Sequence, residues 1–331
     1  MSVSSFQSLL QRFFTDRLLT QLGASQYTVA AYRDTYRLLL KFASERLKRA
    51  PSELCMKDLD TSFLGQFLEH LEVKRGNCTR TRNNRLSAIH AFFQYVAISE
   101  PALALQCQRV LAIPSKRYER RPVEFLTKEE TAALVASPDP GRWIGRRDKA
   151  LLLVAVQTGL RNSEITSLRR QDVKFGIGAH VRCLGKGLKM RCTPLRPDVA
   201  AVLKEWLSQQ NGSPDDPVFP SSNGGRLSAD AFQRLVSRHI ATARRTCPSL
   251  AKKKVTPHTL RHAAAMALLH RGVDLTVIAL WLGHESTETT QIYLHADMQL
   301  KERALAHASS SGLAPDRFRP PDPLLAFLES L

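Results

Sequence analysis

The spacing of apolar residues along the chain predicts a mainly helical fold with one small sheet. Through most of the sequence, apolar residues recur every three or four positions, as on one face of an amphipathic helix. The pattern changes between Val173 and Leu195, where glycines separate short runs of alternating apolar and polar residues. Such alternation is typical of strands, and Gly187 is placed for a tight turn. We therefore expect helices around a small antiparallel β-sheet.

The first hundred residues have the helical pattern alone. It is visible in three segments, residues 25–43, 60–73 and 79–96. A passage rich in proline and charge follows at residues 113–122, and we interpret it as a basic linker. The linker would divide a helical domain, residues 1–112, from a second domain, residues 123–331, that ends in a tail at 308–331.

The second domain is predicted to contain helices before and after the small sheet along the chain. Thr127 and Glu130 form a capping-box pattern that marks the start of a helix. The apolar run Lys149–Thr158 suits a buried helix, and a short helix is expected beyond Arg161. Further helices are expected near residues 196–209, 228–244, 257–271, 274–282 and 287–294.

The positive net charge of the chain indicates an anionic partner. The 331 residues include 48 Lys and Arg against 30 Asp and Glu, a formal charge of +18. Both halves are basic, with 15 basic and 9 acidic residues in 1–115 and 33 and 21 in 116–331. Two basic halves fit two surfaces that grip a long polyanion such as DNA, although a generally basic cytosolic protein is the alternative. The candidates for DNA contact are Arg80, Arg82, Arg85, Lys116, Arg117, Lys189 and Arg191.

The cysteine pattern and the lack of a membrane span or secretory signal predict the cellular compartment. The six cysteines are scattered and contain no CxxC pair, which is typical of free thiols. No uncharged apolar run approaches the about 18–20 residues of a membrane span, and the N-terminal stretch is too interrupted for a secretory signal. We expect a cytoplasmic protein.

A first candidate for chemistry is Arg161, which follows a glycine at a helix boundary in the run TGLR. At such a boundary the guanidinium can leave the backbone and reach a ligand. Its planar fork matches a phosphate through two parallel hydrogen bonds. The alternative is a surface ion pair with Glu164.

Two more candidates lie in the run VTPHTLRH. Thr256 and Pro257 are typical of the N-cap and first residue of a helix. His258 and Arg261 are three residues apart, so they share a face near the positive end of that helix, where an anion is favoured. The alternative is two solvated polar residues in a first turn.

A zinc site is the competing interpretation of this run, because His258 and His262 are four residues apart. Thr259 stands where a metalloprotease-like motif has its glutamate, and no third ligand lies at a familiar spacing. We therefore expect no metal.

Tyr293 is the candidate nucleophile, nine residues after His284 in the run LGHESTETTQIYLH. A tyrosine hydroxyl has a pKa of about 10 and needs cationic neighbours to stabilise the phenolate and the charge that develops during attack. Arg161, Arg261 and the two candidate histidines are suitable groups. The alternative is a half-buried core aromatic.

The predicted hairpin holds a lysine that could donate a proton. Lys186 lies at the turn in the run LGKGLKMR, and Lys189 follows. An amine on such a hairpin could enter a DNA groove and protonate a departing 5′-oxygen. The run lacks the G-x-x-x-x-G-K-[ST] pattern of a nucleotide-binding loop, so we do not expect ATP binding.

Together these motifs resemble the tyrosine recombinases, the family of phage integrases and Xer-type chromosome-dimer resolvases. Residues 25–96 are also similar to the helical, SAM-like core-binding domain of that family. The resemblance implies an N-terminal core-binding domain and a C-terminal α+β catalytic domain. Cys192 and Thr193 depart from the family pattern, which has an aliphatic residue before Pro194. The motifs stand in the family's order: TGLR with Arg161, GKG with Lys186, HTLRH with His258 and Arg261, LGH with His284, and QIYLH with Tyr293.

The resemblance implies a role for each matching residue. Arg161 and Arg261 would clamp the scissile phosphate. His258 and His284 would support it through hydrogen bonds and proton handling. Tyr293 would form a 3′-phosphotyrosine bond and release a 5′-hydroxyl.

Lys186 would be the general acid of that reaction, with Lys189 as a second candidate. Since the protein–DNA link would keep the energy of the broken bond, the resemblance implies that no ATP, metal or other cofactor is needed.

The family resemblance also implies the partners, double-stranded DNA and further recombinase subunits. Members generally act as four subunits around two duplexes and exchange a C-terminal segment. Leu324–Leu331 is apolar enough for such docking, although a frayed tail or one packed on its own subunit is an equal alternative.

Two other functions compete with site-specific recombination. A type IB topoisomerase-like enzyme would relax DNA by the same chemistry, and a catalytically inactive regulator would only bind DNA. The separate helical domain argues against the first, and the full set of candidate residues argues against the second.

Overall fold

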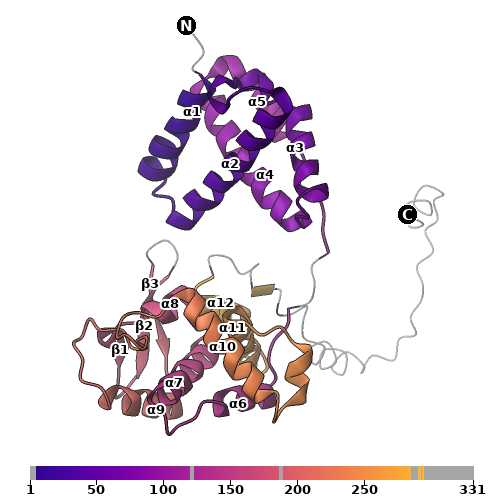
Figure 1. The fold of residues 1–331 in the computed structure, drawn as a ribbon. Helices are drawn as coiled ribbons and strands as arrows, with labels where there is room; N and C mark the ends of the chain where they lie inside the picture. The colour runs from indigo at the N-terminus through magenta and orange to yellow at the C-terminus, as the bar shows by residue number, and fades with distance from the viewer. Residues whose placement is uncertain (1–4, 120–122, 186–188, 285–289, 292, 294–331) are drawn as a thin grey trace, which may run out of the picture. The chain divides into compact units, whose positions relative to one another are not determined.

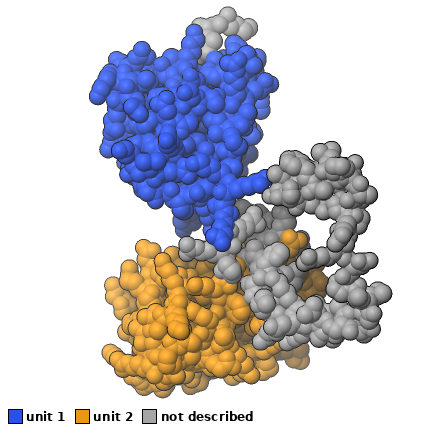
Figure 2. All heavy atoms as spheres, turned by 90° about the vertical axis from the view of Figure 1, so that its right-hand side faces the viewer, with its two compact units in different colours: residues 1–120 blue, residues 121–331 orange. Residues whose placement is uncertain are grey.

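The computed structural model describes residues 5–119, 123–185, 189–284, 290, 291 and 293. The chain divides into two compact units, Met1–Arg120 and Arg121–Leu331, coloured blue and orange in Figure 2. The division falls within the passage interpreted as a linker. The extents given above for the domains and the linker remain predictions. No helix among the described residues is long and apolar enough to cross a membrane.

Unit 1 is helical throughout its described part (Figure 1). Helix α4 packs against α2, α3 and α5. Phe92 of α4 lies at the centre of the core, where its ring contacts those of Phe6, Phe13 and Tyr36. The elements are α1 (Phe6–Arg12), the π-helix η1 (Phe13–Gln21), α2 (Gln26–Leu47), the 3₁₀ turns η2 (Pro51–Glu53) and η3 (Met56–Asp58), α3 (Thr61–Val73), α4 (Thr79–Ser99), the 3₁₀ turn η4 (Pro101–Leu103) and α5 (Ala104–Leu111).

The three helices expected in this unit are present as α2, α3 and α4. The sequence pattern missed α1, η1 and α5. Phe6, Leu9, Leu10, Phe13 and Phe14 do recur every three or four positions, so the apolar period of an amphipathic helix is present in α1 and at the start of η1. The eight residues of α5 are shorter than the window in which that period can be recognised.

Unit 2 combines helices with one small sheet, as expected. The sheet is antiparallel in the order β1-β2-β3, and Val181 pairs with Val173 on one side and Thr193 on the other. The elements are α6 (Lys128–Ala136), α7 (Trp143–Thr158), α8 (Asn162–Ser167), the 3₁₀ turn η5 (Arg170–Asp172), β1 (Val173–Lys174), β2 (His180–Leu184), β3 (Met190–Pro194), α9 (Pro197–Ser208), α10 (Ala229–Ala243), the 3₁₀ turn η7 (Pro248–Lys252), α11 (Pro257–Leu269) and α12 (Leu275–Leu282).

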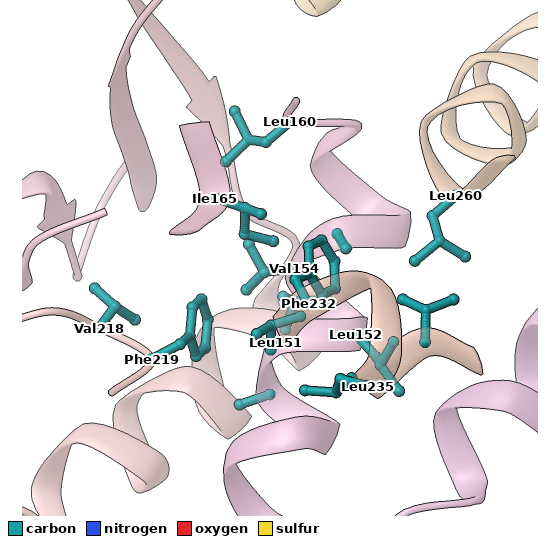
Figure 3. Close-up of a cluster of buried hydrophobic side chains, with 14 of the residues drawn as sticks. Leu151, Leu152, Val154, Leu160, Ile165, Val218, Phe219, Phe232, Leu235 and Leu260 are labelled. Atoms are coloured by element: carbon teal, nitrogen blue, oxygen red, sulfur yellow. The ribbon is translucent and has the colours of Figure 1, made fainter. Parts of the chain in front are cut away.

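Helix α7 is the centre of unit 2, where it packs against α6, α9 and α11. Its Leu151, Leu152 and Val154 meet apolar side chains of α8, α10 and α11 in the core (Figure 3). Helix α7 begins at Trp143, before the apolar run that predicted it. Of the helix expected at 287–294, Thr290, Gln291 and Tyr293 are described, and their backbone is helical.

Two helices begin at the caps that the sequence predicts. Thr127 Oγ1 accepts a hydrogen bond from Glu130 N at 3.3 Å, and the Glu130 carboxylate accepts one from Thr127 N at 2.9 Å. Thr256 Oγ1 accepts from Thr259 N at 3.3 Å, with Pro257 as the first residue of α11. The local start signals of α6 and α11 are therefore confirmed.

A buried carboxylate ties α7 to α10. Asp148 is 0% exposed and accepts hydrogen bonds from Arg147 Nη2, Arg238 Nη2 and His239 Nε2, each at 2.7 Å. Burial opposes ionisation of this carboxyl, but the bonds from His239 and Arg147 outweigh it and hold its pKa below the ordinary value. Asp148 is thus the anion that compensates the positive charge of the buried Arg147 and of Arg238.

We predict that Asp148→Asn lowers the free energy of unfolding by about 3–5 kcal/mol, since it leaves Arg147 buried beside a neutral group. Denaturant unfolding followed by tryptophan fluorescence measures this difference. The pKa of Asp148 is lower in the folded protein than the ordinary aspartate value of about 3.9. Its ionised form therefore stabilises the fold fully above that ordinary value, and this contribution is lost as the pH falls through the pKa of the folded state. The difference between wild type and variant should therefore shrink in acid.

The matched control is Asp215→Asn, which removes the exposed partner of Arg169. Exposed ion pairs contribute about 0–1 kcal/mol. Equal effects of the two substitutions would contradict the special role of Asp148.

Candidate active site

Two glycines end the helices that carry the site. Gly159 and Gly283 follow α7 and α12 in the left-handed conformation, with φ of 63° and 66°. A Cβ atom at Gly159 would lie 2.7 Å from Leu282 Cδ2, and one at Gly283 would lie 2.6 Å from Arg191 Nη1. Both backbone conformation and space therefore require glycine. The ends of the two helices lie close together as a result.

Arg261 joins these two helix ends from α11. Its Nη1 donates to Gly159 O and its Nη2 to Leu282 O, both at 2.7 Å, and the residue is 3% exposed. The carboxyl ends of helices carry partial negative charge that favours a cation. Burial, with the nearby Arg161 charge, lowers the pKa of Arg261 to about 10. The guanidinium nevertheless stays charged at neutral pH.

Glu164 holds two further guanidinium groups. Arg161 Nη1 donates to its Oε1 at 2.8 Å, while Arg191 donates to both oxygens at 2.9 and 2.7 Å. Arg161 Nη2 also donates to Gly283 O at 2.7 Å. Burial opposes the charge of Glu164, but bonds from Arg191 and Arg161 lower its pKa. Arg191 thus links β3 to α8 and lies against Gly283.

Among the residues that the structure describes, the cluster carries more positive than negative charge. The guanidinium groups of Arg161, Arg191 and Arg261 meet the single carboxylate of Glu164. The Arg161 side chain is 31% exposed and can therefore reach a ligand. An excess of partly buried positive charge favours binding of an anion.

Three histidines surround the cluster. The rings of His258 and His262 meet edge to face with centroids 4.4 Å apart, and His284 Nδ1 lies 2.9 Å from Thr290 Oγ1. Burial lowers the pKa of His262 to about 4, helped by His258 and Arg261. Burial and the charges of Arg261 and Arg161 lower that of His284 to about 4 as well. Both rings are neutral at neutral pH.

The Tyr293 hydroxyl lies against this group. Its oxygen is 3.0 Å from His262 Nδ1, and the two ring centroids are 5.5 Å apart. Tyr293 is 1% exposed. Burial raises its pKa to about 12 despite the opposing effect of Arg261. The hydroxyl is therefore protonated at neutral pH and far from an active nucleophile on its own.

The structure brings most of the candidate catalytic residues together in unit 2. Lys186 lies outside the described residues. At the base of its hairpin, Gly185 N donates to Lys189 O at 2.8 Å, and the Lys189 side chain is exposed. The catalytic role of each remains a prediction. The residues brought together are Arg161, His258, Arg261, His284 and Tyr293.

The candidates for DNA contact in unit 1 differ in exposure. Arg82 is buried, and its Nη1 donates to Pro114 O at 3.0 Å. Arg85 is half-buried, while Arg80 and Arg117 are exposed. The exposed Lys116 pairs with Glu72 at 2.6 Å.

DNA contact by any of these residues, and by Lys189 or Arg191, remains a prediction. Burial weighs against Arg82, and the ion pair with Glu164 weighs against Arg191.

Sequence reasoning missed Glu164 and His262. The surface ion pair is the alternative for Glu164, but the residue is buried, its spacing matches a capping box, and its carboxylate accepts from Arg161 N at 2.7 Å. His262 was considered only as a metal ligand. No local signal links it to Tyr293, which is 31 residues away.

Comparisons with known proteins agree with this architecture. Residues 124–300 match the phage integrase family, and residues 10–99 match the phage integrase N-terminal SAM-like domain. The putative integrase/recombinase y4rC of Sinorhizobium fredii is 52% identical over 328 residues, 99% of each chain. The tyrosine recombinase XerD of Vibrio cholerae is 31% identical over 309 residues, 91% of this chain and 96% of the relative.

Solved structures share the fold. The post-cleavage complex of the XerH recombinase with its difH substrate covers 87% of this chain and 82% of its own, with 24% identity and a TM-score of 0.70. A lambda integrase dimer on a core site covers 86% and 96%, with 18% identity and a TM-score of 0.62. The expectation of a core-binding domain followed by a catalytic domain is confirmed. The chain belongs to the phage integrase family of tyrosine recombinases.

Proposed function

We propose that this protein is a site-specific recombinase that cleaves and rejoins double-stranded DNA through a 3′-phosphotyrosine link at Tyr293. The observation that carries the proposal is the Tyr293 hydroxyl, held beside a cluster in which the described arginines outnumber the described carboxylates. A DNA phosphate would supply the missing negative charge. Membership of the tyrosine recombinase family supports the same reaction.

The arginines would bind and stabilise the reacting phosphate. Arg161 is partly exposed and would bind its oxygens through two parallel hydrogen bonds. Arg261 would stabilise the charge that develops as Tyr293 attacks. His258 and His284 would support the phosphate by hydrogen bonds and proton handling.

The exchange of bonds needs no external energy. The Tyr293 oxygen forms a bond to phosphorus, the bond from phosphorus to the 5′-oxygen breaks, and Lys186 gives that oxygen a proton. Lys189 is a second candidate for this acid. The phosphotyrosine keeps the bond energy until a 5′-hydroxyl attacks it, so we propose that the reaction uses no ATP, metal or other cofactor.

We propose that the protein acts in the cytoplasm as part of a homo- or hetero-tetramer on two DNA sites. Integration, excision or transposition of a mobile element, or dimer resolution, are tasks for such an enzyme. The candidate docking segment, Leu324–Leu331 in the tail 308–331, lies outside the described residues.

Replacement of the nucleophile tests the reaction. A duplex library selected for binding supplies the DNA site, and a nicked version of that site traps the cleaved state. We predict that wild-type protein forms a covalent adduct that survives denaturing electrophoresis, whereas Tyr293→Phe binds the DNA without forming it. Tyr118→Phe, at an exposed tyrosine of unit 1, should form the adduct as wild type does.

Equal adduct yields from wild type and Tyr293→Phe would remove the assignment of the nucleophile. Wild-type protein that binds the site but forms no adduct would indicate an inactive regulator. Relaxation of a supercoiled plasmid without the selected site would favour topoisomerase-like activity.

Arg161→Ala tests the phosphate clamp. A preorganised charge at a transition state contributes about 3–4 kcal/mol, so we predict a 10²–10³-fold fall in the rate of single-turnover cleavage. Glu164 keeps its pairing with Arg191 in this variant, which should preserve the fold. The control Arg169→Ala removes an exposed guanidinium paired with Asp215 and should leave the rate unchanged. A wild-type rate in Arg161→Ala would exclude Arg161 from the site.

A further inference from the structure

We propose that His262 is the general base that accepts the proton of Tyr293 during attack on the DNA phosphate. This inference rests on the proposed function. It assigns the proton acceptor to a residue other than the two candidate histidines, His258 and His284.

The geometry suits direct proton transfer. Tyr293 Oη lies 3.0 Å from His262 Nδ1, within the range of a catalytic hydrogen bond. In the tautomer with a proton on Nε2, Nδ1 accepts and the hydroxyl donates. His262 follows Arg261, whose guanidinium is anchored on two backbone carbonyls. The same anchor therefore fixes the part of α11 that carries the imidazole.

Burial of the nucleophile makes a protein base necessary. The Tyr293 side chain is nearly inaccessible to solvent, and burial raises its pKa to about 12. Water cannot readily take the proton of a hydroxyl in such surroundings. Within the part of the chain that the structure describes, the hydrogen bond found for this hydroxyl is the one to His262.

The charge around His262 makes its basicity depend on the DNA. The groups facing it are His258 and Arg261 on its own helix, His284 after α12, and Tyr293. Burial lowers the pKa of His262 to about 4, helped by His258 and Arg261, so the ring is neutral and able to accept a proton. A phosphate bound by Arg161 and Arg261 would offset the positive charges and raise that pKa. The base would therefore gain strength when the substrate is in place.

The proposed step balances in atoms and charge. As the bond from Tyr293 Oη to phosphorus forms, the phenolic proton moves to His262 Nδ1, which becomes an imidazolium. The bond from phosphorus to the 5′-oxygen breaks, and the general acid protonates that oxygen. In rejoining, the 5′-hydroxyl returns its proton to the acid, and His262 returns the other proton to Tyr293.

His262→Asn and His262→Ala test the proposal with the full chain on the nicked duplex. Asparagine can hydrogen-bond from a position similar to Nδ1 but cannot take up a proton. General base catalysis contributes about 10²–10⁴-fold, so we predict a fall of that size in single-turnover cleavage at neutral pH with unchanged DNA affinity. The rate of His262→Asn should increase with pH where that of wild type is level. Added imidazole should restore part of the rate of His262→Ala.

His180→Asn is the matched control, because this imidazole on β2 binds Gly178 O instead. It should cleave as wild type does. Unfolding free energies of all variants show whether a loss of rate is a loss of fold.

Three results would overturn the role of His262. A wild-type rate and pH profile in His262→Asn would show that no proton passes through it. Faster cleavage by His262→Ala would show that the hydrogen bond restrains the nucleophile. A slower rate with an unchanged pH profile and no effect of imidazole would show a purely structural role. In each case the adduct formed by wild type, and lost in Tyr293→Phe, would leave the proposed function intact.

Discussion

The arrangement of unit 2 depends on the Arg261 guanidinium, which bonds the last carbonyls of α7 and α12. A buried cation is tolerated there because the carboxyl ends of two helices offer partial negative charge and unpaired carbonyl oxygens. Arg161 follows the end of α7, His284 follows the end of α12, and His262 follows Arg261 itself. One guanidinium thus sets the relative positions of three segments that are distant in the sequence.

The same cluster leaves positive charge uncompensated. Asp148 accepts from Arg147, Arg238 and His239, whereas Glu164 is the carboxylate that the described residues place among the arginines of the site. Burial, together with these positive charges, lowers the pKa of His262 and of His284 to about 4, so both rings are neutral. Among the described residues, the protein therefore has a structural carboxylate with several donors and a site whose excess positive charge favours an anion.

The sequence predicted the fold and most of the candidate site because their signals are local. The caps at Thr127 and Thr256 lie within one helical turn of the groups they satisfy, and they began α6 and α11 as expected. The alternation between Val173 and Leu195 likewise predicted the sheet. The α-helix Phe6–Arg12 and the π-helix Phe13–Gln21 lie outside the segments expected to be helical, although apolar residues recur every three or four positions there too. DNA contact by Arg82 stays a prediction, and its burial, with a bond to Pro114 O, is not visible in any local pattern.

By itself, then, the sequence determined most of the helices and the sheet, the capped starts of α6 and α11, and which residue types could handle a phosphate. Only the tertiary structure decided which of these groups meet. The bond from Arg161 to Gly283 spans 122 residues, and those from Arg191 to Glu164 and from His262 to Tyr293 span 27 and 31. Periodicity and capping act over a few residues, whereas such contacts depend on how packed helices place their ends, and no local pattern records that placement.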